Sequence, residues 1–147
     1  MSDAIVLLDG ATEPDRRSGV AGGGDFVTYT CRAPDKSTEN EDTVAVIPYG
    51  PGAAVMLVAD GAGGLPAGKR ASLTAAQSLA DSLQKSMAET MLLRTAILDG
   101  IDAANAAVQA LGNGSATTLT VITVEGLTAR AYQIGDSEAL VVGQRGL

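Results

Sequence analysis

The order of apolar and polar residues predicts three strands in the first half of the chain. Apolar residues alternate with Thr and Tyr over Phe26–Cys31, the period of a strand with one buried face. Thr43–Tyr49 predicts a second strand, and the Gly50-Pro51-Gly52 turn separates it from Ala53–Ala59. This last run is continuously apolar, as in a fully buried strand.

Two helices are expected next. Pro66 suits the first position of a helix, because its missing N–H would be unpaired there anyway. Apolar residues then recur at helical spacing in two stripes, and Gly112-Asn113-Gly114 ends the second helix. The first stripe is Ala71, Ala75, Leu79, Leu83 and Met87, with Ser72, Gln77, Ser78, Asp81 and Lys85 off it; the second is Leu93, Ile97, Ile101, Ala104, Val108 and Leu111.

The last third of the chain predicts more strands. Thr117–Val124 and Thr128–Ile134 alternate on either side of Glu125-Gly126, a hairpin turn. A second turn and a further strand, Glu138–Val142, follow. Residues 10–25 predict a surface loop in which 18–24 is the most flexible part. Strands, two helices and strands in this order indicate an α+β fold, a layered sandwich of antiparallel sheets flanked by antiparallel helices.

Composition narrows the chemistry. A length of 147 residues favours a single domain over 1–147. With no His, the chain excludes Ser-His-Asp catalysis and histidine metal ligands, so any metal site must use oxygen ligands, as Mg²⁺ or Mn²⁺ do. The formal net charge of −7 argues against binding to nucleic acids and anionic membranes. The lone Cys31 fits a reducing cytoplasm, and the apolar run Ala4–Leu8 is too short for a signal core.

Three acidic segments could carry chemistry. Asn40-Glu41-Asp42 stands where a loop enters a strand, and could be a cation site or only a solvated charge pair. Asp60 follows a buried strand, where its charge needs a cation or hydrogen-bond donors; a helix-capping role explains it equally well. Gly135-Asp136-Ser137 is explained as an ordinary turn.

A fourth segment imitates a phosphate-binding loop. Gly63–Lys69 reads G-x-x-x-x-G-K after a strand and before a helix. That motif requires Ser or Thr next, to hold Mg²⁺, but Arg70 follows here. Pro66 also removes one N–H from the cradle. A nucleotide-binding P-loop protein is therefore a minor alternative.

Taken together, the acidic segments resemble one family. Asn40-Glu41-Asp42, Val58-Ala59-Asp60-Gly61-Ala62-Gly63-Gly64, Thr117-Thr118-Leu119 and Ile134-Gly135-Asp136-Ser137-Glu138-Ala139 follow the order of the motifs in PPM-type (type 2C) protein serine/threonine phosphatases. The similarity spans about residues 25–143.

The resemblance implies metal-dependent hydrolysis of phosphoserine and phosphothreonine in proteins by a water held on two Mg²⁺ or Mn²⁺ ions. It implies that Asp60 bridges the two metals and that the Gly61 carbonyl binds one of them. Glu41 would hold that metal through water, and Asp42 would support the ligands. Asp136 would belong to an accessory metal site. The implied partners are phosphorylated proteins.

The chain departs from the family in three places. Ser37 stands where the family has a phosphate-gripping Arg, and Arg32 or Lys36 is the nearest substitute. Ala62 stands where some members have His, so water would protonate the leaving oxygen. The later S-D-G and D-N motifs do not occur before Leu147, so we expect a domain without its C-terminal strands. A catalytically inactive relative that binds a phosphoprotein or a regulator is therefore the main alternative.

Overall fold

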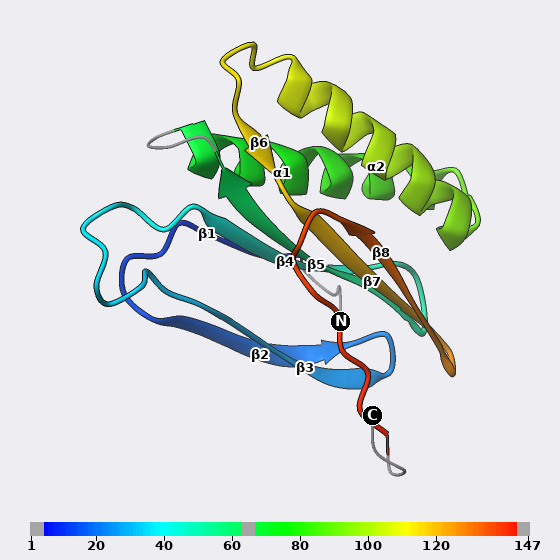
Figure 1. Ribbon diagram of the computed structural model, residues 1–147. Helices are drawn as coiled ribbons and strands as arrows, with labels where there is room; N and C mark the ends of the chain where they lie inside the picture. Colours follow the sequence, from blue (N-terminus) through cyan, green and yellow to red (C-terminus); the bar gives the residue numbers. More distant parts are fainter. Residues whose placement is uncertain (1–4, 63–66, 144–147) are drawn as a thin grey trace.

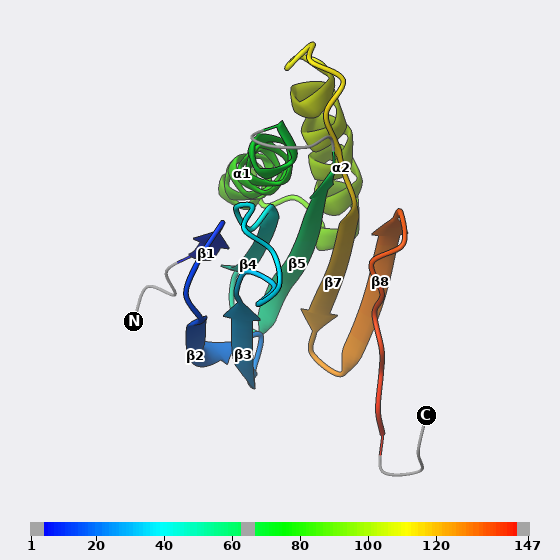
Figure 2. The same cartoon turned by 60° about the vertical axis from the view of Figure 1, so that its left-hand side comes forward.

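The structure is a computed structural model that describes residues 5–62 and 67–143. An antiparallel sheet forms its centre, flanked by two helices on one face and a separate hairpin on the other (Figures 1 and 2). The sheet order is β1 (Val6–Asp9), β4 (Asp42–Pro48), β5 (Ala53–Ala62), β7 (Leu119–Glu125) and β8 (Thr128–Ile134), and the short β6 (Ala116–Thr117) pairs with β5. The hairpin is β2 (Asp15–Ala21) and β3 (Gly24–Thr30), and the helices are α1 (Ala67–Ala88) and α2 (Leu93–Gln109). The predicted α+β class is confirmed.

The main core lies between α1 and the central strands. Alternation along β5 turns Val55 and Leu57 toward α1, whose Leu79 and Leu83 are fully buried. Small residues on the inner side of α1 let the helix approach the sheet closely. α2 packs mainly on α1, and Gly100 of α2 sits against Leu79. Burial of this face therefore follows the two predicted stripes, except that Met87 is exposed at the end of α1.

Tight turns fix the register of the central strands. Gly50 and Gly52 both adopt positive φ in the turn between β4 and β5, a conformation that strongly favours glycine. The resulting ladder places Asp42 opposite Asp60. The β7–β8 hairpin turns at Gly126-Leu127, with Glu125 opposite Thr128. The sequence predicted a turn at Glu125-Gly126, but Glu125 is the last residue of β7.

Residues 10–25 are not a loop, as the sequence predicted, but include β2 and the start of β3. The hairpin turns at Gly22-Gly23, both at positive φ, and pairs Asp15 with Thr30. Its residues are largely exposed, which explains why the sequence lacks a hydrophobic period there. The apolar run near the N-terminus likewise becomes a strand, β1, along the edge of β4.

Two further strand predictions need correction. β5 does not end at Ala59 but continues through Asp60 and Gly61 to Ala62, because β4 and β6 pair with it there. Glu138–Val142, expected to be a strand, is extended without strand pairing, and Leu140, Val141 and Val142 are exposed. The sheets of the described residues include no strand pairing for this segment.

Neither α1 nor α2, the two helices of the described ranges, has the combination of length and apolar character that a membrane crossing requires.

Candidate functional site

Two carboxylates meet at the end of the central sheet. Asp42 and Asp60 are direct cross-strand partners of β4 and β5, on the face turned away from the helices. Burial raises the pKa of Asp42, and the negative charge of Asp60 raises it further, while Lys36 opposes the rise. Like charges placed opposite each other on a sheet are unfavourable unless a cation lies nearby. The pair is therefore electrostatically suited to a cation.

Glu41 directs its carboxylate to the other face of the sheet, toward the first turn of α1. Its Oε1 is buried and has no hydrogen-bond partner in the described part of the chain. A methyl group built on Gly68 would lie 2.7 Å from this oxygen and 2.8 Å from the Gly61 carbonyl oxygen. The absence of a side chain at Gly68 thus leaves room where two oxygens converge. An unpartnered carboxylate oxygen beside a carbonyl oxygen is a donor set that suits a hard cation.

The backbone that carries these acids is held by two buried polar side chains. Asn40 donates from Nδ2 to Thr30 Oγ1 (2.8 Å) and to the Ala11 carbonyl (3.2 Å), and its Oδ1 accepts from the Asp42 N–H (3.0 Å). Asn40 therefore ties the β1–β2 connection and the end of β3 to the start of β4.

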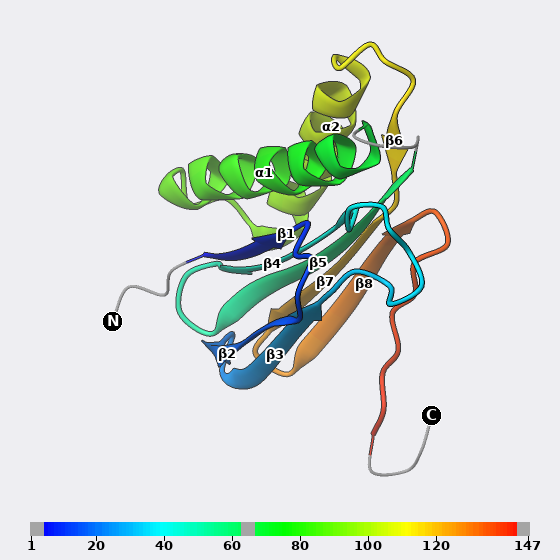
Figure 3. The ribbon, with the colours of Figure 1, turned by 90° about the vertical axis from the view of Figure 1, so that its left-hand side faces the viewer.

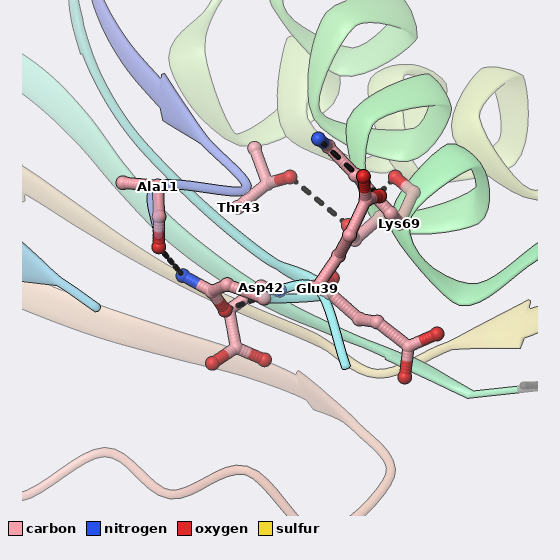
Figure 4. A network of polar contacts seen from close by, with 8 residues as sticks. Ala11, Glu39, Asp42, Thr43 and Lys69 are labelled. Carbon is pink, nitrogen blue, oxygen red and sulfur yellow. Dashed lines mark hydrogen bonds and ion pairs between the residues drawn. The ribbon is translucent and has the colours of Figure 1, made fainter. Parts of the chain in front are cut away.

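Ser72 of α1 is the second of these side chains and is fully buried. Its Oγ lies 2.6 Å from the Glu41 carbonyl oxygen and 3.0 Å from Thr43 Oγ1. Because a hydroxyl has one proton, Ser72 donates to the carbonyl and accepts from Thr43. The Glu41 carbonyl also accepts the Gly61 N–H (3.2 Å), so this one oxygen joins β4, β5 and α1. Figure 4 shows the network around Ala11, Thr43 and Lys69.

Cationic side chains lie beside the acids. A pocket of about 190 Å³ is lined by Arg32 and Lys36 from the loop between β3 and β4 together with Glu41, Asp42 and Asp60. Figure 3 shows this loop at the same end of the sheet as β6. Lys69 does not line this pocket, although its Nζ lies 3.6 Å from Oε2 of Glu39, which does. The structure thus brings five of the six residues whose side chains were singled out in the sequence to the lining of one pocket, although the Glu41 carboxylate itself points toward Gly68.

Asp136 is the exception, since it does not line that pocket. It is exposed in the turn that follows β8, and the turn is held through its neighbours. Thr118 Oγ1 lies 2.7 Å from Ser137 Oγ, and Thr120 Oγ1 donates to the Ser137 carbonyl at 3.0 Å. Thr118 Oγ1 in turn accepts the Asp60 N–H at 3.0 Å. The turn is therefore connected to Asp60 by hydrogen bonds, although no contact of the Asp136 carboxylate itself with the acid pair is seen.

A comparison with known protein families matches residues 33–147 to Protein phosphatase 2C. The chain belongs to the protein phosphatase 2C family. Comparisons with curated proteins and with solved structures found no match. The family segment begins within the loop that carries Lys36, so Arg32 and the β2–β3 hairpin lie outside it.

Protein phosphatases 2C are generally metal-dependent. Within 5–62 and 67–143, no three His, Cys, Asp or Glu side chains are grouped to hold one ion. The reason is the strand geometry: Glu41 and Asp42 are consecutive and point to opposite faces of the sheet. The four oxygen-bearing residues instead form two pairs, Asp42 with Asp60 and Glu41 with Gly61.

The P-loop alternative does not suit this family member. Residues 63–66 of the motif, including Pro66, lie outside the described residues, and Lys69 is paired with Glu39. The strands that follow the helices, β6 and β7, both pair antiparallel with β5, whereas a P-loop belongs to a parallel βαβ unit.

Sequence reasoning missed Asn40, Ser72 and Thr118 as supporting residues. Ser72 was expected off the buried stripe, yet it is buried because the first turn of α1 packs on the entry to β4. The signal available for Asn40 was its place two residues before Asp42, the spacing of a side chain that bonds a backbone N–H. Thr118 offered no local signal, since its role depends on a ladder formed with a strand 58 residues away.

Proposed function

We propose that the chain is a metal-dependent protein phosphatase that hydrolyses phosphoserine and phosphothreonine in proteins. The observation that carries this proposal is the cross-strand pair Asp42–Asp60, which shares one pocket with Glu41, Arg32 and Lys36. Acids that attract cations and side chains that attract phosphate are both required for phosphoryl transfer, and here they lie side by side.

The residues present fit Mg²⁺ or Mn²⁺, with two ions as in the family. Glu41 Oε1 is buried and has no hydrogen-bond partner among residues 5–62 and 67–143, and the negative charges of Asp42 and Asp60 repel each other. In this proposal Asp60 and the Gly61 carbonyl would hold the ions, Glu41 would contribute through water, and Asp42 would support Asp60. Divalent ions bound there would lower the pKa of a water and neutralise charge on the phosphoryl oxygens. Asp136 would serve an accessory site.

The loop before β4 would bind the phosphate. Ser37 occupies the place of the family's Arg and is exposed, whereas Arg32 and Lys36 line the pocket. Arg32 can form a two-pronged contact with phosphate oxygens, and Lys36 adds a mobile positive charge. Ala62 carries no proton to give, so water would protonate the leaving oxygen. A cytoplasmic site of action and a single domain over 1–147 stay predictions.

A second candidate is a phosphoprotein-binding module without turnover. It is favoured by Ser37 and by the absence of a group of three acidic ligands within the described ranges. Such a module would retain Arg32 and Lys36 as the phosphate contacts. The two candidates share a phosphate site and differ in whether hydrolysis follows.

The test is hydrolysis of p-nitrophenyl phosphate and of a phosphothreonine peptide with Mn²⁺. We expect turnover that depends on Mn²⁺ and falls at least about 100-fold in Asp60→Asn. Asp99→Asn, at an exposed carboxylate on α2, is the matched control and should keep full activity. Peptide binding without turnover in the wild-type chain would favour the second candidate, and neither binding nor turnover would defeat both.

A further inference from the structure

The ladder along β5 changes its character at Asp60. Pairing of β5 with β7 runs from Ala53 opposite Glu125 to Val58 opposite Thr120, and pairing with β6 continues at Gly61 opposite Thr117. The register is the same in both parts, so Asp60 faces Thr118 in the gap between them. Because the register does not shift across the interruption, no residue has been inserted into either strand. The regular backbone hydrogen bonding is instead interrupted locally, where Asp60 faces Thr118.

Thr118 contacts Asp60 with its side chain in place of its carbonyl. Its N–H donates to the Asp60 carbonyl oxygen at 2.9 Å, as a ladder residue does. A regular antiparallel pair would return the bond from the Asp60 N–H to the Thr118 carbonyl. Here the Asp60 N–H donates to Thr118 Oγ1 at 3.0 Å. Thr118 therefore binds both backbone polar groups of Asp60, the N–H through its hydroxyl, and is the sole partner of that N–H among the described residues, whereas the Asp60 carbonyl also accepts from Thr117 Oγ1 at 3.0 Å.

The hydroxyl can do what a carbonyl cannot, because it also has a proton to donate. Thr118 Oγ1 lies 2.7 Å from Ser137 Oγ in the turn after β8. The methyl group of Thr118 packs on the same turn, since a side chain built on Gly135 would come within 2.7 Å of Thr118 Cγ2. Thr120 and Gln133 both donate to the Ser137 carbonyl, so the turn is itself anchored.

We propose that Thr118 is a positioning residue that fixes the Asp60 peptide and couples it to the Gly135–Ser137 turn. The inference rests on the proposed function, in which Asp60 holds divalent ions. Thr118 contacts neither substrate nor ion. It acts by setting the orientation of the Asp60 peptide within β5, and it makes Asp60 and the turn bearing Asp136 move as one unit.

The contact is tested first in the metal-free protein. Thr118→Val keeps the shape and removes the hydroxyl, whereas Thr118→Ser keeps the hydroxyl. We expect hydrogen exchange of the Asp60 amide, followed by NMR, to become about tenfold faster in Thr118→Val and to return near the wild-type rate in Thr118→Ser. Protection that is unchanged in Thr118→Val would mean that the carbonyl can take over the bond, and would overturn the proposal.

Titration calorimetry with Mn²⁺ tests the consequence for the site. Loss of a group that orients a ligand typically weakens metal binding about 10- to 100-fold, and we expect this in Thr118→Val, with recovery in Thr118→Ser. Thr128→Val, at an exposed position of β8, is the matched control. Mn²⁺ affinity in Thr118→Val equal to that of the wild type would refute the positioning role alone. Absence of Mn²⁺ binding in the wild type, or binding unchanged in Asp60→Asn, would refute the proposed function and the inference with it.

Discussion

The Ser72 hydroxyl gives the sharpest prediction about how the acidic edge is held. Its replacement in Ser72→Ala removes the donor to the Glu41 carbonyl and the acceptor for Thr43 Oγ1. The carbonyl keeps the Gly61 N–H as a partner, but the Thr43 hydroxyl is fully buried and is left unpaired. The structural cost of the variant is therefore carried mainly by Thr43.

The magnitude follows from two opposing contributions. A buried polar group that loses its partner costs about 1–3 kcal/mol. Alanine is a better helix former than serine by roughly 0.5 kcal/mol, which offsets part of this cost. We expect Ser72→Ala to lower the free energy of unfolding by about 1–2 kcal/mol. Ser82→Ala, at a half-buried position further along α1, is the control and should be neutral or slightly stabilising.

Urea unfolding followed by circular dichroism measures the effect, with Thr43→Val completing a double-mutant cycle. Once Ser72 is alanine, Thr43→Val removes an unpaired hydroxyl, so it should cost less than in the wild type, or even stabilise. The coupling energy should be about 1 kcal/mol, in the range found for residues in contact. Additive effects of the two substitutions, or a Ser72→Ala variant as stable as Ser82→Ala, would show that this hydroxyl pair does not hold the edge.

Three further predictions concern the same region. The pKa of Asp42 is raised in the folded metal-free protein, so Asp42 binds its proton more tightly there than in the unfolded chain. The protonated carboxyl therefore contributes stability below a pH of about 4, and this contribution is lost as the pH rises through the raised pKa. Asp42→Asn should remove this part of the pH dependence of urea unfolding. Gly68→Ala should destabilise the protein by about 1–3 kcal/mol in thermal melts, because the added methyl group would meet Glu41 Oε1. Gly100→Ala, whose methyl group would make ordinary contacts, is the control and should stabilise by up to ~1 kcal/mol. Equal effects of the two substitutions would contradict the close packing at Gly68. Lys69→Ala should leave any weak ATP binding unchanged in an equilibrium assay, because Lys69 forms an ion pair with Glu39. Loss of ATP binding in this variant would instead support the P-loop alternative.

The strands and helices of the core could be predicted because their apolar residues recur at the expected periods. The pairing of Asp42 with Asp60 could also have been predicted from the sequence. A turn centred on Pro51 between two predicted strands pairs residues whose numbers sum to 102, and these include Asp42 and Asp60. The β2–β3 hairpin was not predicted, because its strands are mostly exposed and its two-glycine turn has the composition of a flexible loop.

The supporting hydrogen bonds depend on contacts between distant segments. The Ser72 and Thr43 hydroxyls meet only after α1 has packed on β4, and Thr118 meets Asp60 only in the completed ladder. Polar residues at such positions give no periodic signal, and a serine in an amphipathic helix is first assigned to the exposed face. Their importance becomes visible only when each buried polar atom is matched with its partner.

The Asn40 amide shows that the family segment and the folding unit have different limits. The matched region begins at residue 33, yet the two acceptors of the Asn40 amide protons, the Ala11 carbonyl and the Thr30 hydroxyl, precede it. A recombinant fragment started at the family boundary would lose both acceptors and so the anchor of the peptide next to Asp42. Expression trials and grafts of this domain onto other proteins should therefore include the β1–β2 connection and the β2–β3 hairpin, although both lie outside the matched family segment.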